Sequence, residues 1–161
     1  MNDHIDQLVA RAESTLIALQ STPHSAARPL ALQFGHEIGK VGRQLAQHLE
    51  FGPAVHAFVE RTAPIIRTDT RLSSWISRVY DAAESRSSDA EVYVSALTLR
   101  SELEFFRDLY RDSAAKHYVS GIETDETDAN LREWGSEQNL DEIPMGFPPS
   151  HVWWYQSLTG K

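Results

Sequence analysis

Residues 89–110 read DAEVYVSALTLRSELEFFRDLY, and this stretch decides the fold class. Its apolar side chains recur at alternating steps of four and three residues, at Val92, Ala96, Leu99, Leu103, Phe106 and Tyr110. That spacing places them on one face of an α-helix, which turns once every 3.6 residues. The pattern predicts one long helix over about 89–119 that stops at Gly121. Ser88 and Glu91 have the spacing of a capping box at its start.

The same spacing predicts further helices before this one. A first helix ends at Thr22-Pro23, and a second spans about 25–50 with Pro29 in its opening turns. A short third helix is expected to stop near Pro64, and a fourth covers about 72–83. No convincing alternating apolar and polar run predicts a strand. We therefore predict an all-α, single-domain helical bundle of four to five main helices.

The C-terminal part differs in character from this bundle. Residues 1–120 are expected to form the bundle, and residues 121–161 an acidic and aromatic C-terminal segment packed on the same domain. One short helix is expected around 128–138. After it, the run 143–149 contains three prolines, which fix φ and remove hydrogen-bond donors, so no regular element is expected there. Ser150 is placed to cap a last turn over 151–155.

Composition excludes several function classes. The 161 residues include no cysteine, which excludes disulfides, a cysteine nucleophile and thiolate metal sites. No segment approaches the ~20 apolar residues of a membrane helix, and the N-terminus lacks the pattern of a secretory signal. These features predict a cytoplasmic protein. The net charge is −8, and residues 121–145 hold eight acids against one base. Because phosphate binding requires the opposite polarity, we expect no nucleic-acid partner.

No metal or catalytic site is expected. The histidines His4, His24, His36, His48, His56, His117 and His151 show no ligand spacing. Glu104, Asp108 and Asp112 form a row on the long helix, with three arginines interleaved: Arg100, Arg107 and Arg111. We interpret these as surface ion pairs. The glycines Gly35, Gly39 and Gly42 follow one side of the second helix, where they favour close helix packing over a ligand site.

The acidic and aromatic residues of the C-terminal segment are the candidate partner-binding site. The acidic members are Glu123, Asp125, Glu126, Asp128, Glu133, Asp141 and Glu142, and the ring-bearing members are His151, Trp153, Trp154 and Tyr155. Three successive large aromatics cannot all face one core, so an exposed one is a candidate hot spot. The alternatives are that these aromatics only anchor the tail, and that the acidic run is a solubilising loop.

A short C-terminal motif adds a family resemblance. Residues 143–154 fit the pattern IPxGxPxSHxWW, which resembles a signature of small helical bacterial proteins, some of them immunity proteins that neutralise secreted antibacterial toxins. The resemblance implies stoichiometric inhibition of a toxin, and an acidic surface suits a basic toxin domain.

Three functions therefore remain open. The first is a cytoplasmic binding protein, monomeric or weakly dimeric, that inhibits such a toxin without cofactor or catalysis. The second is a small helical enzyme or ligand-binding protein with a cavity between the second and fifth helices, lined by His36, His48 or Glu104. The third is a scaffold or adaptor domain.

Overall fold

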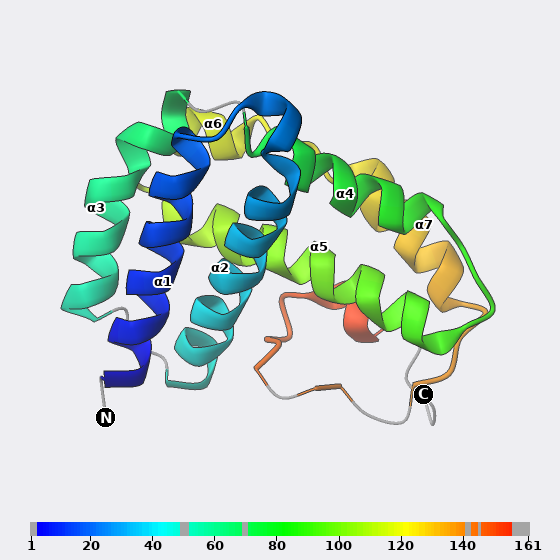
Figure 1. Ribbon diagram of the computed structural model, residues 1–161. Helices are drawn as coiled ribbons and strands as arrows, with labels where there is room; N and C mark the ends of the chain where they lie inside the picture. Colours follow the sequence, from blue (N-terminus) through cyan, green and yellow to red (C-terminus); the bar gives the residue numbers. More distant parts are fainter. Residues whose placement is uncertain (1–2, 49–51, 69–70, 141–142, 145, 156–161) are drawn as a thin grey trace.

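The computed structural model describes residues 3–48, 52–68, 71–140, 143–144 and 146–155 (Figure 1). Within these residues the chain forms helices and turns without a β-strand, which confirms the all-α class. The helices in chain order are α1 Asp3–Gln20, η1 His24–Ala26, α2 Arg28–His48, α3 Pro53–Thr68, α4 Ser73–Glu84, α5 Ala90–Tyr110, α6 Lys116–Ser120, α7 Asp125–Gly135 and η2 Val152–Tyr155.

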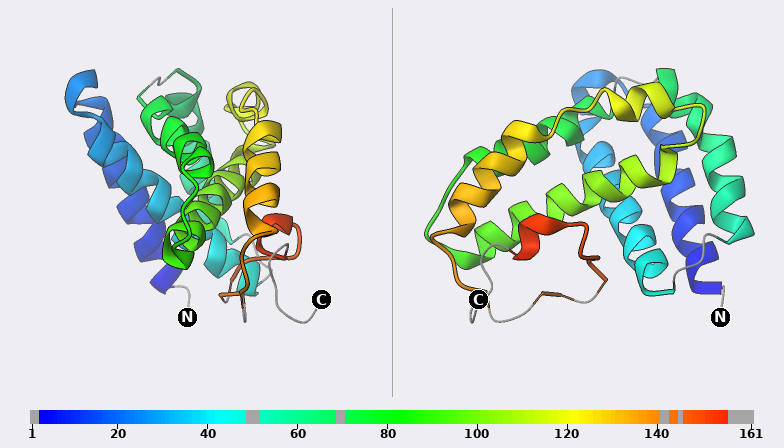
Figure 2. Two further views of the ribbon diagram at one scale, coloured as in Figure 1. Left: turned by 90° about the vertical axis from the view of Figure 1, so that its right-hand side faces the viewer. Right: turned by 180° about the vertical axis from the view of Figure 1, so that it is seen from behind.

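The helix α5 lies at the centre of the arrangement. It packs against α2, α4, α6 and α7, while α1 packs on α2 and α3 (Figure 1). Seen from behind, α7 lies beside α4, and η2 lies against the side of α5 away from α6 (Figure 2). None of the helices in the described residues is both long and apolar enough to cross a membrane.

The core is centred where α2, α4 and α5 meet. Phe34 of α2, Trp75 of α4 and Phe106 of α5 are fully buried, with Trp75 and Phe106 ring centroids 5.2 Å apart in an edge-to-face arrangement. Such aromatic pairs contribute roughly 0.5–1.5 kcal/mol beyond the burial of their area. Phe106 belongs to the stripe that predicted the helix, as do the buried Ala96, Leu103 and Tyr110, whereas Val92 of the same stripe is 39% exposed and Leu99 is only partly buried.

The three glycines of α2 make room for side chains of α4 and α5. A Cβ atom on Gly35 would lie 2.3 Å from the Trp75 ring, and one on Gly42 would lie 2.2 Å from Cγ of Phe105. A Cβ on Gly39 would lie 2.6 Å from Cγ of Glu102. The predicted packing role is confirmed, although side chains rather than a helix backbone occupy the space. This packing leaves no room for a ligand at the glycine face.

The predicted end of the third helix at Pro64 is wrong, because α3 continues through Pro64 to Thr68. Proline removes one main-chain hydrogen bond and costs a helix interior about 3 kcal/mol. Here Pro64 is exposed, and Ala63 and Ile66 on either side are buried in the core. Burial of both flanks offsets the lost hydrogen bond, a tertiary effect that local sequence signals do not contain.

The long central helix begins one residue later than expected. Its N-cap is Asp89, whose carboxylate accepts a hydrogen bond from the Glu91 amide at 2.9 Å. Ser88 is exposed and is not the cap, so the predicted capping box is wrong. The adjacent Ser87 hydroxyl instead accepts from the Asp89 amide, which fixes the turn before the helix.

The same helix also ends earlier than expected, at Tyr110. The Ser113 hydroxyl donates to the Tyr110 carbonyl at 2.7 Å and accepts from the Ala115 amide at 3.1 Å. A serine that bonds the main chain in this way competes with helical hydrogen bonds. The remaining residues of the predicted run form α6, which Gly121 ends as expected through its amide bonds to the carbonyls of that helix.

We expect Asp89→Ala to lower the free energy of unfolding by about 0.5–2 kcal/mol, because it removes the carboxylate that caps the α5 N-terminus. Ser88→Ala is the matched control and should change it by less than about 0.5 kcal/mol. Denaturant titration of both variants measures the difference. A larger loss in Ser88→Ala than in Asp89→Ala would contradict this start of the helix.

Candidate partner-binding site

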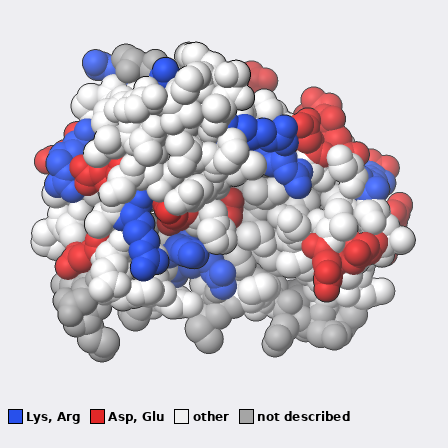
Figure 3. All heavy atoms as spheres, in the orientation of Figure 1, with Lys and Arg blue, Asp and Glu red and all other residues white. Residues whose placement is uncertain are grey.

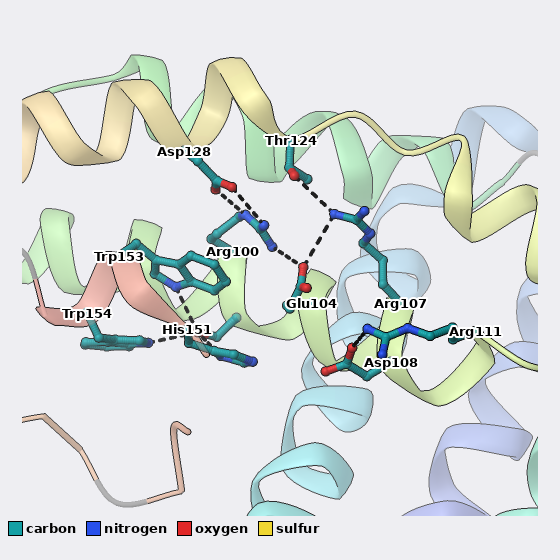
Figure 4. Close-up of polar contacts among 11 residues, drawn as sticks. Arg100, Glu104, Arg107, Asp108, Arg111, Thr124, Asp128, His151, Trp153 and Trp154 are labelled. Atoms are coloured by element: carbon teal, nitrogen blue, oxygen red, sulfur yellow. Dashed lines mark hydrogen bonds and ion pairs between the residues drawn. The ribbon is translucent and has the colours of Figure 1, made fainter. Parts of the chain in front are cut away.

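A single buried hydroxyl holds the C-terminal strap, which we define as residues 146–155. Ser101 lies in the middle of α5 and is fully buried. It accepts hydrogen bonds from Nε1 of Trp153 at 3.1 Å and from Nε1 of Trp154 at 2.8 Å, and it lies 2.9 Å from Nδ1 of His151 (Figure 4). A hydroxyl has two lone pairs and one hydrogen. Since both lone pairs face indole N–H groups, the hydrogen is donated to His151 Nδ1.

This assignment fixes the protonation state of His151. With Nδ1 as acceptor, the neutral ring carries its proton on Nε2, which faces no protein acceptor among the described residues. A second proton on Nδ1 would meet a hydroxyl whose lone pairs are already used. Burial lowers the pKa of His151 to about 4; the charge of Glu104 opposes this shift, and the nearby Arg100 charge adds to it.

Ring contacts extend the attachment of the strap beyond Ser101. The His151 ring lies 4.5 Å from Phe105 of α5 and stacks on Trp153 at 5.0 Å, centroid to centroid. Trp154 stacks on Phe147 at 4.5 Å. The rings of His151, Trp153 and Trp154 are therefore buried parts of the molecule, and they are not available at the surface for a partner.

Arg100 connects the strap to α7. Its side chain is only 3% exposed, and it makes a bidentate pair with Asp128 at 2.6 and 3.1 Å. It also pairs with Glu104 at 2.9 Å, and its guanidinium lies 4.1 Å from the centre of a Trp153 ring. One arginine thus joins α5, α7 and the strap (Figure 4).

The carboxylate row of α5 is only partly the surface feature that was expected. Arg111 and Asp108 form an exposed pair, as predicted. Glu104 instead faces α7, where it contacts Arg100 and also Arg107 at 3.5 Å. Arg107 also donates to the hydroxyl of Thr124 at 3.1 Å, just before α7 begins. The interpretation of Arg100 and Glu104 as surface ion pairs is therefore wrong, because α7 and the strap cover them.

An acidic hollow lies on the outer surface between α4, α7 and the connection that leads from α6 to α7. It has a volume of about 480 Å³ and is lined by Tyr80, Glu84, Gly121, Glu123, Asp125, Glu126 and Thr127. Its four carboxylates are exposed, and none forms an ion pair with another described residue. Burial and then the charge of Glu123 raise the pKa of Tyr80, so its phenol remains a neutral hydrogen-bonding group. Acidic side chains gather over α4 and α7 in Figure 3.

The predicted acidic residues that the structure describes therefore divide among three environments. Glu123, Asp125 and Glu126 line the acidic hollow, whereas Asp128 points inward to Arg100. Glu133 is exposed and pairs with Arg86 at 2.8 Å. Asp141 and Glu142 lie outside the described residues.

Three of the four predicted ring-bearing residues are not at the surface. Trp154 is fully buried, Trp153 is 3% exposed and His151 is fully buried, which corresponds to the anchoring alternative. Tyr155 is half-buried. Ser101 was not among the residues predicted from the sequence, although its position on a buried helix face was detectable. Four apolar residues recur at a spacing of four around it, and Ser101 is the polar member of this series: Tyr93, Leu97, Phe105 and Leu109.

The residues proposed to line a cavity between α2 and α5 do not come together. The side chain of His36 is 62% exposed and lies 3.2 Å from Glu102, which raises the pKa of His36 through their hydrogen bond. Glu104 faces α7, and the side chain of His48 lies outside the described part of the chain. Among the described residues no three His, Asp or Glu side chains gather in a way that could hold a metal ion.

The chain matches no protein-family model, no curated protein and no solved structure. The partner-binding hypothesis therefore depends on the geometry and charge of the acidic hollow.

We expect Ser101→Ala to lower the free energy of unfolding by about 2–6 kcal/mol, because two buried indole N–H groups lose their acceptor at roughly 1–3 kcal/mol each. Ser95→Ala, an exposed serine on the same helix, is the control and should change little. Denaturant titration followed by tryptophan fluorescence measures both. Equal stability of the two variants would contradict the role of this hydroxyl.

Stability should also decrease as the pH falls from about 6.5 towards 4. The unfolded chain protonates His151 near its ordinary pKa of 6.5, whereas the folded chain does so only near 4, so the unfolded state binds more protons in this window. The full difference corresponds to about 3 kcal/mol. Denaturant titrations at pH 7 and pH 4 should therefore show a larger loss in the wild type than in His151→Gln. An equal loss in the two proteins would show that His151 does not titrate this way.

Proposed function

We propose that the chain is a binding protein whose acidic hollow contacts a basic protein partner. The observation that supports this most directly is the set of four exposed carboxylates around one hollow, without a basic partner among the described residues. Opposite charge on a partner would speed its encounter and fix its orientation. Tyr80 adds an aromatic surface of the kind that contributes to binding hot spots.

Only two of the four carboxylates are explained by a stabilising effect on the helix that they belong to. Asp125 and Glu126 lie in the first turn of α7, where negative charge favours the helix dipole. Glu84 belongs to the last turn of α4, where a negative charge is unfavourable to the dipole, and Glu123 precedes α7. Two of the four therefore lack this local explanation, which favours a role at the surface.

The partner class that we propose is a basic toxin domain, inhibited by stoichiometric binding. The C-terminal motif resembles that of small immunity proteins, and the chain is acidic, with a net charge of −8. In this proposal the motif acts indirectly: its tryptophans and His151 hold the strap on α5, and Arg100 beneath them holds α7 through Asp128. The partner then meets carboxylates on a rigidly positioned α7.

The test is affinity capture from the producing cells with three versions of the tagged protein. The hollow variant carries Glu123→Gln, Asp125→Asn and Glu126→Gln. The matched control removes three exposed carboxylates elsewhere, by Asp6→Asn, Glu60→Gln and Asp112→Asn. We expect the wild type and the control to retain one basic protein that the hollow variant loses.

For the purified pair, the hollow substitutions should lower the association rate by at least about tenfold at low salt and change the dissociation rate less. One equivalent of the wild type should abolish the toxic activity of the partner. A partner that the hollow variant retains as well as the wild type does would contradict the acidic hollow as the interface, and a captured partner whose activity is unchanged would contradict inhibition.

A further inference from the structure

A basic trough lies on the surface between α1 and α2. We define it by His4, Leu8 and Arg11 of α1 and by Lys40, Arg43 and two glutamines of α2, around a hollow of about 390 Å³. Residues 4, 8 and 11 follow one face of α1, and residues 40, 43, 44 and 47 follow one face of α2. The two helices pack side by side, so the two stripes border one continuous trough. Basic side chains gather over this part of α1 and α2 in Figure 3.

The lining of the trough combines cations with amide donors and contains no carboxylate. Arg11 and Lys40 are exposed and supply two permanent positive charges, Arg43 lies beside them, and the amides of Gln44 and Gln47 supply neutral donors. Of the acidic neighbours on the adjoining turns, Glu37 accepts from Gln33 at 3.0 Å through Oε1, while its Oε2 has no hydrogen-bond partner among the described residues, and Glu102 pairs with His36.

The strap holds one of these cations in place. The guanidinium of Arg43 lies 4.6 Å from the centre of the Phe147 ring. The strap backbone passes close by at Gly146, where φ is +95° and a Cβ atom would lie 3.0 Å from Cβ of Arg43. Arg43 is therefore held by the strap at the edge of the trough.

We propose that the basic trough binds a small polyanion that carries phosphate or carboxylate groups. Guanidinium groups form bidentate hydrogen bonds with both kinds of oxyanion, and an ammonium group adds a point charge. The volume lies within the range of small-molecule sites, and Leu8, only 4% exposed, supplies an apolar floor. The trough is formed by α1 and α2, whereas the acidic hollow is formed by α4, the connection between α6 and α7, and α7 itself, so this inference is independent of the proposed protein partner.

Calorimetric titration with inorganic pyrophosphate and with citrate at low ionic strength tests this inference. We expect saturable binding of at least one anion at one site per chain, with a Kd of about 1 mM or tighter. Tighter binding of pyrophosphate indicates a phosphorylated ligand, and tighter binding of citrate indicates a polycarboxylate. Either result supports anion binding at the trough, provided that the trough variant weakens it and the control variant does not.

The double variant Arg11→Gln, Lys40→Gln should weaken binding by at least about tenfold, because each charged hydrogen bond contributes to affinity. The control, Arg28→Gln with Arg67→Gln, removes the same charge from exposed arginines at the start of α2 and in the last turn of α3, and should bind as the wild type does. Both substituted sites are exposed, and circular dichroism checks that each variant is folded. Absence of saturable binding below about 10 mM, or an equal loss in the control, would overturn the proposal.

Discussion

The hydrogen bonds of one buried hydroxyl hold the C-terminal strap on α5. Ser101 accepts two indole N–H groups and donates to His151, so each hydrogen-bonding position of the hydroxyl is used. A hydroxyl with this capacity cannot be replaced by an apolar side chain of similar size without leaving buried donors unpaired. The strap, which contains Pro148 and Pro149, therefore lies against α5 in one register without forming a regular element before η2.

The same attachment determines which acidic residues face outward. Trp153 covers Arg100, and the buried guanidinium holds Asp128 from the first turns of α7. Once Asp128 points inward, Asp125 and Glu126 on the same helix lie at the surface beside Glu84 of α4. The acidic hollow is thus a consequence of how α7 is held. At the other end of the strap, Phe147 contacts Arg43 at the basic trough, so one segment supports two surfaces of opposite charge.

The sequence alone predicts the helices that are set by local apolar spacing. Its predictions are wrong where packing between distant segments decides the structure. The spacing of apolar residues identifies α2 and most of α5, and glycine packing on α2 is also predictable. The predicted helix end at Pro64 is wrong because buried residues on both sides stabilise α3 beyond it. The predicted cap at Ser88 is wrong because the neighbouring Asp89 carboxylate caps the helix instead. Trp153 and Trp154 follow one another too closely for one face of a regular element, yet both are buried, because η2 is a short 3₁₀ turn whose indoles converge on Ser101.

The central claim is that the strap is a fixed part of the folded molecule, and hydrogen exchange of the indole N–H groups tests it most directly. With the four indole resonances assigned by single tryptophan substitutions, the account predicts that Trp153 and Trp154 exchange only in the larger opening reactions that also expose Trp75 of the core. Exchange of both strap indoles at the rate of a solvent-exposed indole, while Trp75 stays protected, would show that the strap is not fixed on the folded molecule.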